Sequence, residues 1–119
     1  MNEVEMMYSN AGLEPTLFYD CESYNQKVEK GYLFTAEKRL SLIKWLSEQY
    51  TITTRYMASA WFITAETSDV TRTVIKYTVT ANTFEEAIAS AINHIWFWQD
   101  LTEEECKQIR NILESEVRE

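Results

Sequence analysis

The chain has 119 residues, of which 45% are hydrophobic and 13% aromatic, and its net charge is −8. This length and composition are those of one globular domain, and they exclude a chain that is disordered throughout. No apolar run approaches the roughly 20 residues of a membrane-spanning helix. The N-terminal stretch MNEVEMMYSN has acids where a secretory signal would be basic and then apolar. We therefore expect a cytoplasmic protein that does not associate with membranes.

The residues that usually carry chemistry are scarce. Cys21, Cys106 and the single histidine, His94, are too few for the usual zinc sites, and cytosolic thiols stay reduced. The chain has two glycines, so it can form neither a GxGxxG fingerprint nor a Walker loop. No nucleophile motif surrounds His94. The sequence therefore predicts a protein that is not an enzyme and that needs no metal and no cofactor.

The charge is distributed unevenly along the chain. Residues 1–34 have a net charge of −4 and residues 83–119 a net charge of −6, whereas residues 35–50 and 51–82 have +1 each. Two acidic ends therefore flank a nearly neutral middle. Such a distribution repels phosphate backbones and favours basic partners, although it also serves solubility alone.

The chain begins with a segment that shows no sustained period. Residues 1–34 nevertheless contain six aromatic rings, too many for a plain disordered tail. We interpret residues 1–34 as an acidic N-terminal arm that is partly ordered against the remainder. Residues 35–119 then form a single α+β domain, because no linker or repeat divides them.

A helix is predicted next, from the N-cap Thr35 to about Tyr50. Its apolar stripe steps by three and four residues, and Leu42 and Trp45 flank it. The stripe consists of Ala36, Leu40, Ile43, Leu46, Ser47 and Tyr50.

Strand composition follows, with ten threonines between Thr51 and Thr83. We predict strands near residues 50–57, 59–66 and 71–80, with a turn at 66–70. Apolar and polar residues alternate in the last two strands, which indicates an antiparallel sheet with one covered face.

Two capping boxes mark the last two helices, Thr83–Glu86 and Thr102–Glu105. The first helix should bury Phe84, Ala87, Ile88, Ala91, Ile92 and Ile95. The second has the apolar stripe Cys106, Ile109, Ile112, Leu113 and Val117. The predicted fold is thus α+β, in the order α-β-β-β-α-α, with a three-stranded antiparallel sheet. The N-terminal arm is predicted to pack on this domain.

The end of the first of these two helices, AINHIWFWQD, gathers three rings around the only histidine. At about 100° per residue, Trp98 falls on the inward stripe and Phe97 points away from the core. Trp96 and Phe97 either pack under the last helix or form an exposed patch. His94 is expected to be a histidine at the rim of the core, bonded to backbone or solvent.

The element order resembles that of the double-stranded RNA-binding domain, a family that grips phosphates with basic residues at the start of its final helix. The equivalent stretch here, TANTFEEAIAS, has two glutamates and no base. We therefore predict no direct binding to nucleic acid.

A closer resemblance is to small phage-encoded domains of the ABA-sandwich type. It covers residues 35–98 and rests on TAEKRLSLIKWL, SAWFITA and TFEEAIASAINHIW. The resemblance implies a phage or prophage protein that acts in the cytosol of a bacterial host. It brings no catalytic residues to this chain.

Two functions follow as hypotheses. The first is a non-catalytic protein that binds a host protein with a basic surface, such as a nucleic-acid-targeting defence complex, in the manner of an anti-CRISPR inhibitor. Its carboxylates would stand in for phosphates while its rings supply desolvated contacts. The binding residues would be Trp96, Phe97, Asp100, Glu103 and Glu104. The second is a structural or housekeeping phage protein that forms a homodimer through Trp96 and Phe97.

Overall fold

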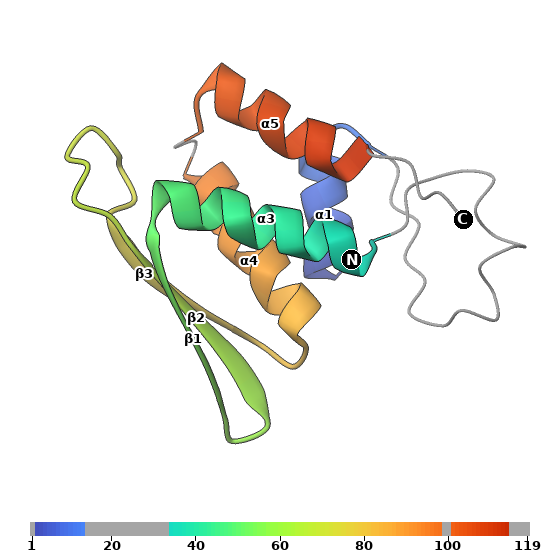
Figure 1. Cartoon of the computed structure of the whole chain (residues 1–119), viewed down its shortest axis with the longest axis vertical. Coiled ribbons are helices and arrows are strands. Elements are labelled where there is room, and N and C mark those ends of the chain that lie inside the picture. The colour runs from blue at the N-terminus through green and yellow to red at the C-terminus, as the bar shows by residue number, and fades with distance from the viewer. Residues whose placement is uncertain (1, 14–33, 99–100, 115–119) are drawn as a thin grey trace, which may run out of the picture.

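The computed structural model describes residues 2–13, 34–98 and 101–114 of the chain. Its elements are α1 (Glu3–Asn10), α3 (Ala36–Gln49), β1 (Thr51–Met57), β2 (Ala60–Glu66), β3 (Lys76–Ala81), α4 (Phe84–Phe97) and α5 (Glu103–Glu114). From α3 onward the order is α-β-β-β-α-α, as predicted. Figure 1 shows the helices gathered above an antiparallel sheet whose β1–β2 hairpin projects from the molecule. No helix of the described ranges is long and apolar enough to span a membrane.

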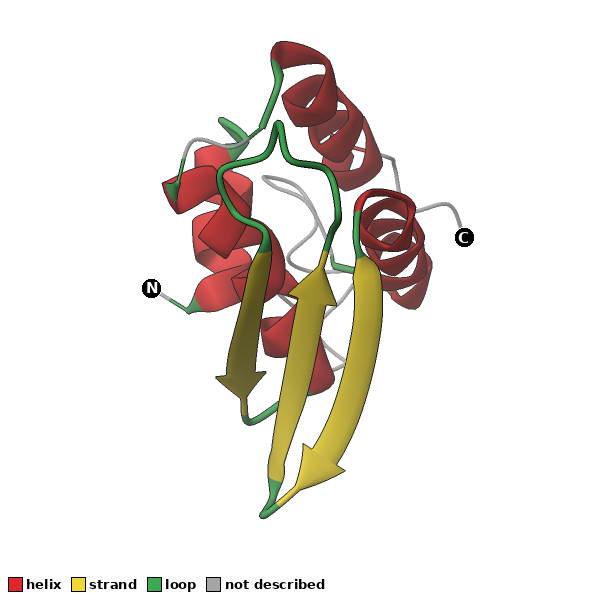
Figure 2. Cartoon of the chain, turned by 90° about the vertical axis from the view of Figure 1, so that its left-hand side faces the viewer, coloured by secondary structure: helices red, strands yellow, loops and turns green. Residues whose placement is uncertain are grey.

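The sheet has the order β1-β2-β3, and both pairs are antiparallel (Figure 2). Across the two ladders Ile63 lies opposite Val79, and Thr64 lies between Thr53 and Thr78. Ile63 and Val79 are buried beneath α4, whereas Thr53 and Thr78 are exposed. The predicted alternation, with one face covered, is therefore confirmed.

The third strand begins later than predicted, at Lys76 and not at residue 71. The Asp69 carboxylate accepts hydrogen bonds from both the backbone N–H and the hydroxyl of Thr71, at 3.0 and 2.6 Å. The backbone N–H of Thr67 donates to the carbonyl of Ile75, which closes the loop at 2.8 Å. These local bonds compete with the ladder, so the turn that was predicted at 66–70 extends to residue 75.

The β1–β2 hairpin turns through two residues of unusual conformation. Ala58 and Ser59 have φ angles of 52° and 63°, and they lie between the paired residues Met57 and Ala60. Positive φ at both central residues defines a type I′ turn, which matches the twist of the strands but normally uses asparagine and glycine. The turn therefore stores backbone strain.

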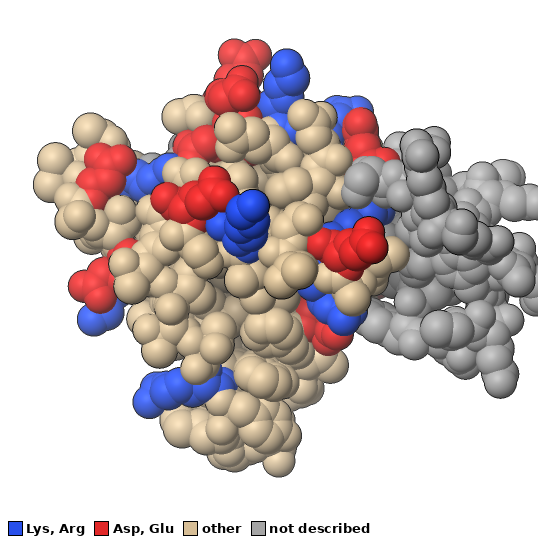
Figure 3. Space-filling view, viewed as in Figure 1, with Lys and Arg blue, Asp and Glu red and all other residues tan. Residues whose placement is uncertain are grey.

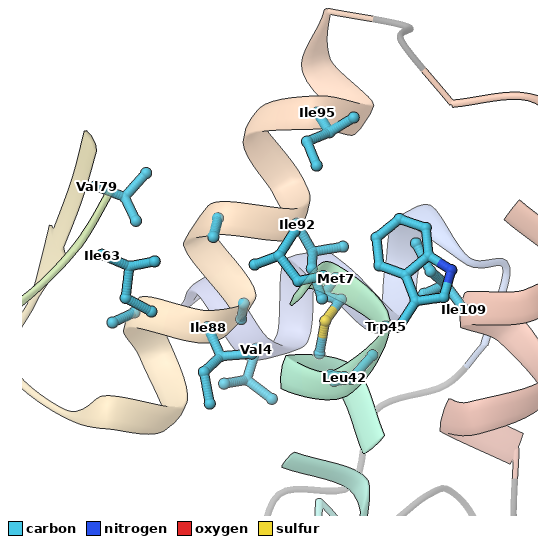
Figure 4. Packing of buried hydrophobic residues seen from close by; sticks show 14 of the residues in the cluster. Val4, Met7, Leu42, Trp45, Ile63, Val79, Ile88, Ile92, Ile95 and Ile109 are labelled. Carbon is cyan, nitrogen blue, oxygen red and sulfur yellow. The ribbon is translucent and has the colours of Figure 1, made fainter. Parts of the chain in front are cut away.

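The core is built around α4, in which Ala87, Ile88, Ala91, Ile92 and Ile95 are fully buried. These are the inward residues predicted for this helix, apart from Phe84, which is half-buried. Figure 4 shows Ile88 and Ile92 between the sheet and the other helices.

The N-terminal segment contributes a helix that its sequence did not indicate. In α1, Val4, Met7 and Tyr8 are fully buried against the same core as α4, which agrees with an arm packed on the domain. The Asn93 side chain of α4 donates to the backbone carbonyl and the carboxylate of Glu3, at 2.7 and 2.9 Å. Asn2 caps the helix by accepting from the N–H of Glu5. The remainder of the predicted arm, residues 14–33, lies outside the described residues.

The inward face of α3 differs from the predicted stripe. Leu42, Trp45 and Leu46 are buried, whereas Leu40 is 72% exposed. Apolar residues lie on several sides of this helix, so its period alone does not predict which side is buried. The buried side is the one against which α5 packs. The Trp45 indole N–H donates to Gln108 of α5 at 2.8 Å.

Lys38 is buried on the same face of α3. Its ammonium donates to the carbonyl of Leu113, at 2.8 Å, near the C-terminal end of α5. Burial lowers the pKa of this lysine to about 8, because desolvation disfavours the charged form.

In α5, Ile109 and Leu113 are buried and Cys106 and Ile112 are half-buried, as the predicted stripe requires. Val117, the last residue of that stripe, lies outside the described residues. Cys106 is a free thiol.

Candidate functional site

The candidate site is where α4 ends and α5 begins, at one corner of the molecule (Figure 1). Phe97, the last residue of α4, is 78% exposed. The prediction that Phe97 points away from the core is therefore confirmed. Trp96 is half-buried and packs against the core, so of the two alternatives left open for this ring the structure favours packing.

Trp98 was predicted to lie on the inward stripe, and this is wrong, because 52% of the residue is exposed. Trp98 is the C-cap residue, with φ −84° and ψ 4°, and stands one position beyond the last helical residue. The helical period predicts the direction of a side chain. It does not predict whether the sheet or another helix extends far enough to cover that side chain. The indole instead packs on neighbouring rings at the surface.

Those rings form a row of four side chains, which we call the aromatic row: Tyr77, His94, Trp98 and Phe97. His94 stacks on Tyr77 with ring centroids 4.4 Å apart and an interplanar angle of 13°. Trp98 lies 6.4 Å from His94 and meets Phe97 edge-on at 5.6 Å. The row begins at a buried residue of the sheet and ends at the most exposed ring of the helix, so Phe97 and Trp98 are held by packing although they are exposed.

His94 supports this row from the middle, between Tyr77 and Trp98. Burial lowers the pKa of its imidazole, so the neutral ring is favoured at neutral pH. Beneath it, the Tyr77 hydroxyl donates to the carbonyl of Ala91 at 2.8 Å. Burial also raises the pKa of Tyr77 far above its usual range, which keeps the phenol protonated. The rim position predicted for His94 was correct, but its partner is an aromatic ring.

The acids at the start of α5 have two different roles. Glu105 is buried and completes the predicted capping box with Thr102, each side chain accepting from the other's backbone N–H at 3.2 Å. Glu103 and Glu104 are exposed, and they form no ion pair with any residue in the described ranges. Asp100 lies outside the described residues. Phe97 ends α4, and two exposed carboxylates, Glu103 and Glu104, begin α5 a few residues later, at the neighbouring end of that helix (Figure 1).

A buried ion pair that sequence analysis missed holds this turn of α5 in place. The Arg72 guanidinium lies 2.5 Å from the Glu105 carboxylate, and each side chain is 11% exposed. Arg72 also donates to Gln49 at 2.9 Å and lies over the ring of Tyr50, with 5.4 Å to its centroid. It thereby joins the loop after β2 to the end of α3 and the start of α5. No local sequence signal could reveal this pair, because 33 residues separate its members.

Within the described ranges, no three His, Cys, Asp or Glu side chains gather in a way that could hold a metal ion. A shallow cleft of about 400 Å³ lies between α3 and α5, with Trp45 and Gln108 in its wall, and none of the predicted site residues lines it. The arrangement offers exposed rings and carboxylates on a rigid support, which is suited to contact with another macromolecule.

The fold and the site define a small α+β protein with an exposed aromatic and acidic corner. No family model matches the chain, and neither the curated proteins nor the solved structures contain a significant match.

Proposed function

We propose that this is a non-catalytic binding protein that docks on a partner with a basic surface. The docking surface is the aromatic–acid corner, which we define as Trp96, Phe97, Trp98, Glu103 and Glu104. The observation that supports it is the 78% exposure of Phe97 beside Trp98 at the end of α4.

The rings provide the apolar part of this surface. A large exposed aromatic side chain gains about 2 kcal/mol when it is fully removed from water. Phe97 and Trp98 are in edge contact with each other and are supported by His94, so little side-chain entropy is lost when a partner covers them. Tryptophan and other rings in such positions are the usual anchors of protein interfaces.

The acids determine the kind of partner. Glu103 and Glu104 are exposed at the start of α5, the helix that follows the rings in the chain, and the whole chain has a net charge of −8. Figure 3 shows further carboxylates over the helical part of the molecule, interspersed with Lys and Arg side chains. An acidic field of this kind speeds encounter with a basic surface and repels acidic ones.

The finer proposal names the partner class. If the resemblance to phage-encoded ABA-sandwich domains extends to biological context, the protein acts in the cytosol of a bacterium. A basic groove that normally holds nucleic acid, as in a host defence complex, is then the surface that the corner would occupy. Glu103 and Glu104 would take the place of phosphates there, and the rings would take the place of stacked bases.

The alternative is a structural phage protein that forms a homodimer through Trp96 and Phe97. The same exposed ring supports it. In a two-fold contact centred on Phe97, however, the Glu103 and Glu104 pairs of the two copies would face each other. Like charges at an interface weaken it, so the corner favours a basic partner over a second copy.

Binding to purified nucleic-acid-targeting effector complexes, measured by biolayer interferometry, tests the proposal. Phe97→Ala should weaken binding by at least about ten-fold, because an interface anchor is truncated. The Glu103→Gln/Glu104→Gln variant should slow association and reduce its dependence on salt. Leu40→Ala is the matched apolar control, since Leu40 is 72% exposed on α3, and Glu66→Gln is the matched charge control.

Two outcomes would contradict the proposal. One is an association rate that does not change with salt, which removes the role of the carboxylates. The other is equal loss of binding in Phe97→Ala and Leu40→Ala, which removes the role of the corner. Sedimentation of Phe97→Ala against the wild type decides the alternative, because a dimer built on this ring would dissociate.

A further inference from the structure

The free edge of β1 is the feature that the proposed function does not use. In the order β1-β2-β3, the seven residues of β1 have a paired neighbour on one side only. Figure 2 shows β1 at the border of the sheet, with α3 beside its beginning and no other described element along the rest. Within the described residues, the backbone of β1 forms hydrogen bonds with β2 alone.

The register shows which backbone groups are free. A two-residue turn makes Met57 and Ala60 a hydrogen-bonded pair, and such pairs alternate along an antiparallel ladder. Residues 51, 53, 55 and 57 therefore bond β2. Ile52, Thr54 and Tyr56 direct their N–H and C=O groups away from the sheet.

Of the usual protections against further pairing, this edge has a single one, the charged side chain of Arg55. Natural edge strands are shortened, bulged, or interrupted by proline or lysine. β1 has the sequence TITTRYM, with neither of these residues, and its register with β2 is continuous from Thr51 to Met57. Its only charged residue is Arg55.

We propose that β1 pairs with β1 of a second copy, in antiparallel orientation about a two-fold axis at Thr54. The two three-stranded sheets would then join into one sheet of six strands. Thr54 would exchange two backbone hydrogen bonds with Thr54 of the second copy, and Ile52 would pair with Tyr56 on either side of the axis. Six backbone hydrogen bonds close the interface, and the two-fold axis stops further growth.

The choice of register follows from the free groups and from Arg55. A slip of one residue would set outward groups opposite inward ones, so no ladder could form. A slip of two residues towards the hairpin turn would place Arg55 opposite Arg55, and like charges directly opposite are destabilising. With the axis at Thr54, Arg55 lies opposite Thr53. Tyr56, which is 58% exposed, lies opposite the half-buried Ile52, an aromatic and β-branched pair of the kind that stabilises sheets.

Charge is the reason why the occupant is a second copy. Two molecules with a net charge of −8 repel each other over most of their surfaces. Residues 51–65 contain no acid and one base. Figure 3 shows the projecting hairpin free of acidic atoms on the visible face, in contrast to the helical part above it. The hairpin is thus where two copies approach with the least repulsion.

Sedimentation velocity of the full chain over a range of concentrations tests this proposal. We expect a reversible dimer for the wild type. Thr54→Lys sets two ammonium groups against each other at the axis, so it should raise the dimer dissociation constant by about ten-fold or more. Thr80→Lys is the matched control, because Thr80 is an exposed threonine of β3, and it should leave the dimer intact. Circular dichroism and the urea midpoint establish that both variants are folded.

A crosslink tests the register itself. Facing residues of a hydrogen-bonded antiparallel pair have Cα atoms about 5.5 Å apart, within the range of a disulfide. Thr54→Cys should form a disulfide-linked dimer on mild oxidation, with residue 54 joined to residue 54 in peptide mapping, and Thr80→Cys should not.

Three results would overturn the proposal. The first is a wild-type chain that stays monomeric at the highest accessible concentration. The second is a dimer that Thr54→Lys and Thr80→Lys affect equally. The third is a dimer that survives Thr54→Lys and dissociates in Phe97→Ala, which would place the contact at the aromatic–acid corner. The first two results leave binding to a basic partner untouched, whereas the third would also favour the homodimer alternative at the corner, so failure of this proposal and failure of the proposed function are distinguishable.

Discussion

Breaking the Arg72–Glu105 pair should destabilise the protein far more than breaking a surface ion pair. Arg72→Met removes the guanidinium and leaves the Glu105 carboxylate buried, with the Thr102 N–H as its remaining partner shown at hydrogen-bond distance. Glu105→Gln keeps an oxygen for the capping box, because glutamine also serves at that position, and removes only the charge.

The magnitude follows from burial. Loss of one partner from a fully buried pair costs about 3–5 kcal/mol. Both side chains here are 11% exposed, so water relieves part of this cost, and we expect about 2–3 kcal/mol for Arg72→Met. The double variant should recover part of the loss, with a coupling energy of about 1.5 kcal/mol.

Urea unfolding followed by tryptophan fluorescence measures these free energies. A loss of about 2 kcal/mol lowers the urea midpoint by roughly 1–2 M at an ordinary m value. The chain supplies its own control in Arg110 and Glu114, an i,i+4 pair on α5 whose side chains are 50% and 39% exposed. Arg110→Met and Glu114→Gln should each cost less than about 0.5 kcal/mol.

Equal and small coupling energies in the two pairs would refute the reasoning. They would mean that water reaches the Arg72 guanidinium as freely as it reaches Arg110. A change in m value in Arg72→Met would instead indicate that the denatured state, and not the ion pair, accounts for the effect.

Two further predictions concern the hairpin turn and the buried lysine. Replacing Ala58 by Asn and Ser59 by Gly should stabilise the protein by about 1–2 kcal/mol, because both positions have positive φ; an unchanged urea midpoint would show that the turn is not strained. Lys38 has a folded-state pKa of about 8, below the 10.5 of the unfolded chain, so between these pH values the unfolded state binds more protons. Stability of the wild type relative to Lys38→Met should therefore rise from pH 8 to 10.5, and parallel stability–pH curves of the two proteins would contradict the prediction.

Much of the fold could be predicted because its signals lie within a few residues of one another. Thr83 and Thr102 each cap a helix by accepting from a backbone N–H three residues later, at 3.2 Å in both cases. Five inward residues of α4 follow from its period, but Ala89 and Asn93 are also buried, which the period did not predict. The outward direction of Phe97 follows from the same period.

The failures share one cause. α1 has a weak apolar pattern and is held by contacts with α4 some 90 residues away, including the bond from Asn93 to Glu3. The inward face of α3 depends on the packing of α5 against it. Trp98 is exposed because it lies beyond the edge of the core. The residues next to these positions in the sequence do not indicate any of these contacts.

The sequence by itself therefore determined the helix caps, the alternation of the strands and the presence of rings and carboxylates in the C-terminal third. These depend on hydrogen bonds and periods that span a few residues. Only the tertiary structure decided that Glu105 turns inward to Arg72 while Glu103 and Glu104 face solvent, and that His94 supports Trp98 from above Tyr77. Which side chains are buried depends on which surfaces come into contact in the folded protein. The free energy of these tertiary contacts cannot be predicted from any short stretch of the sequence.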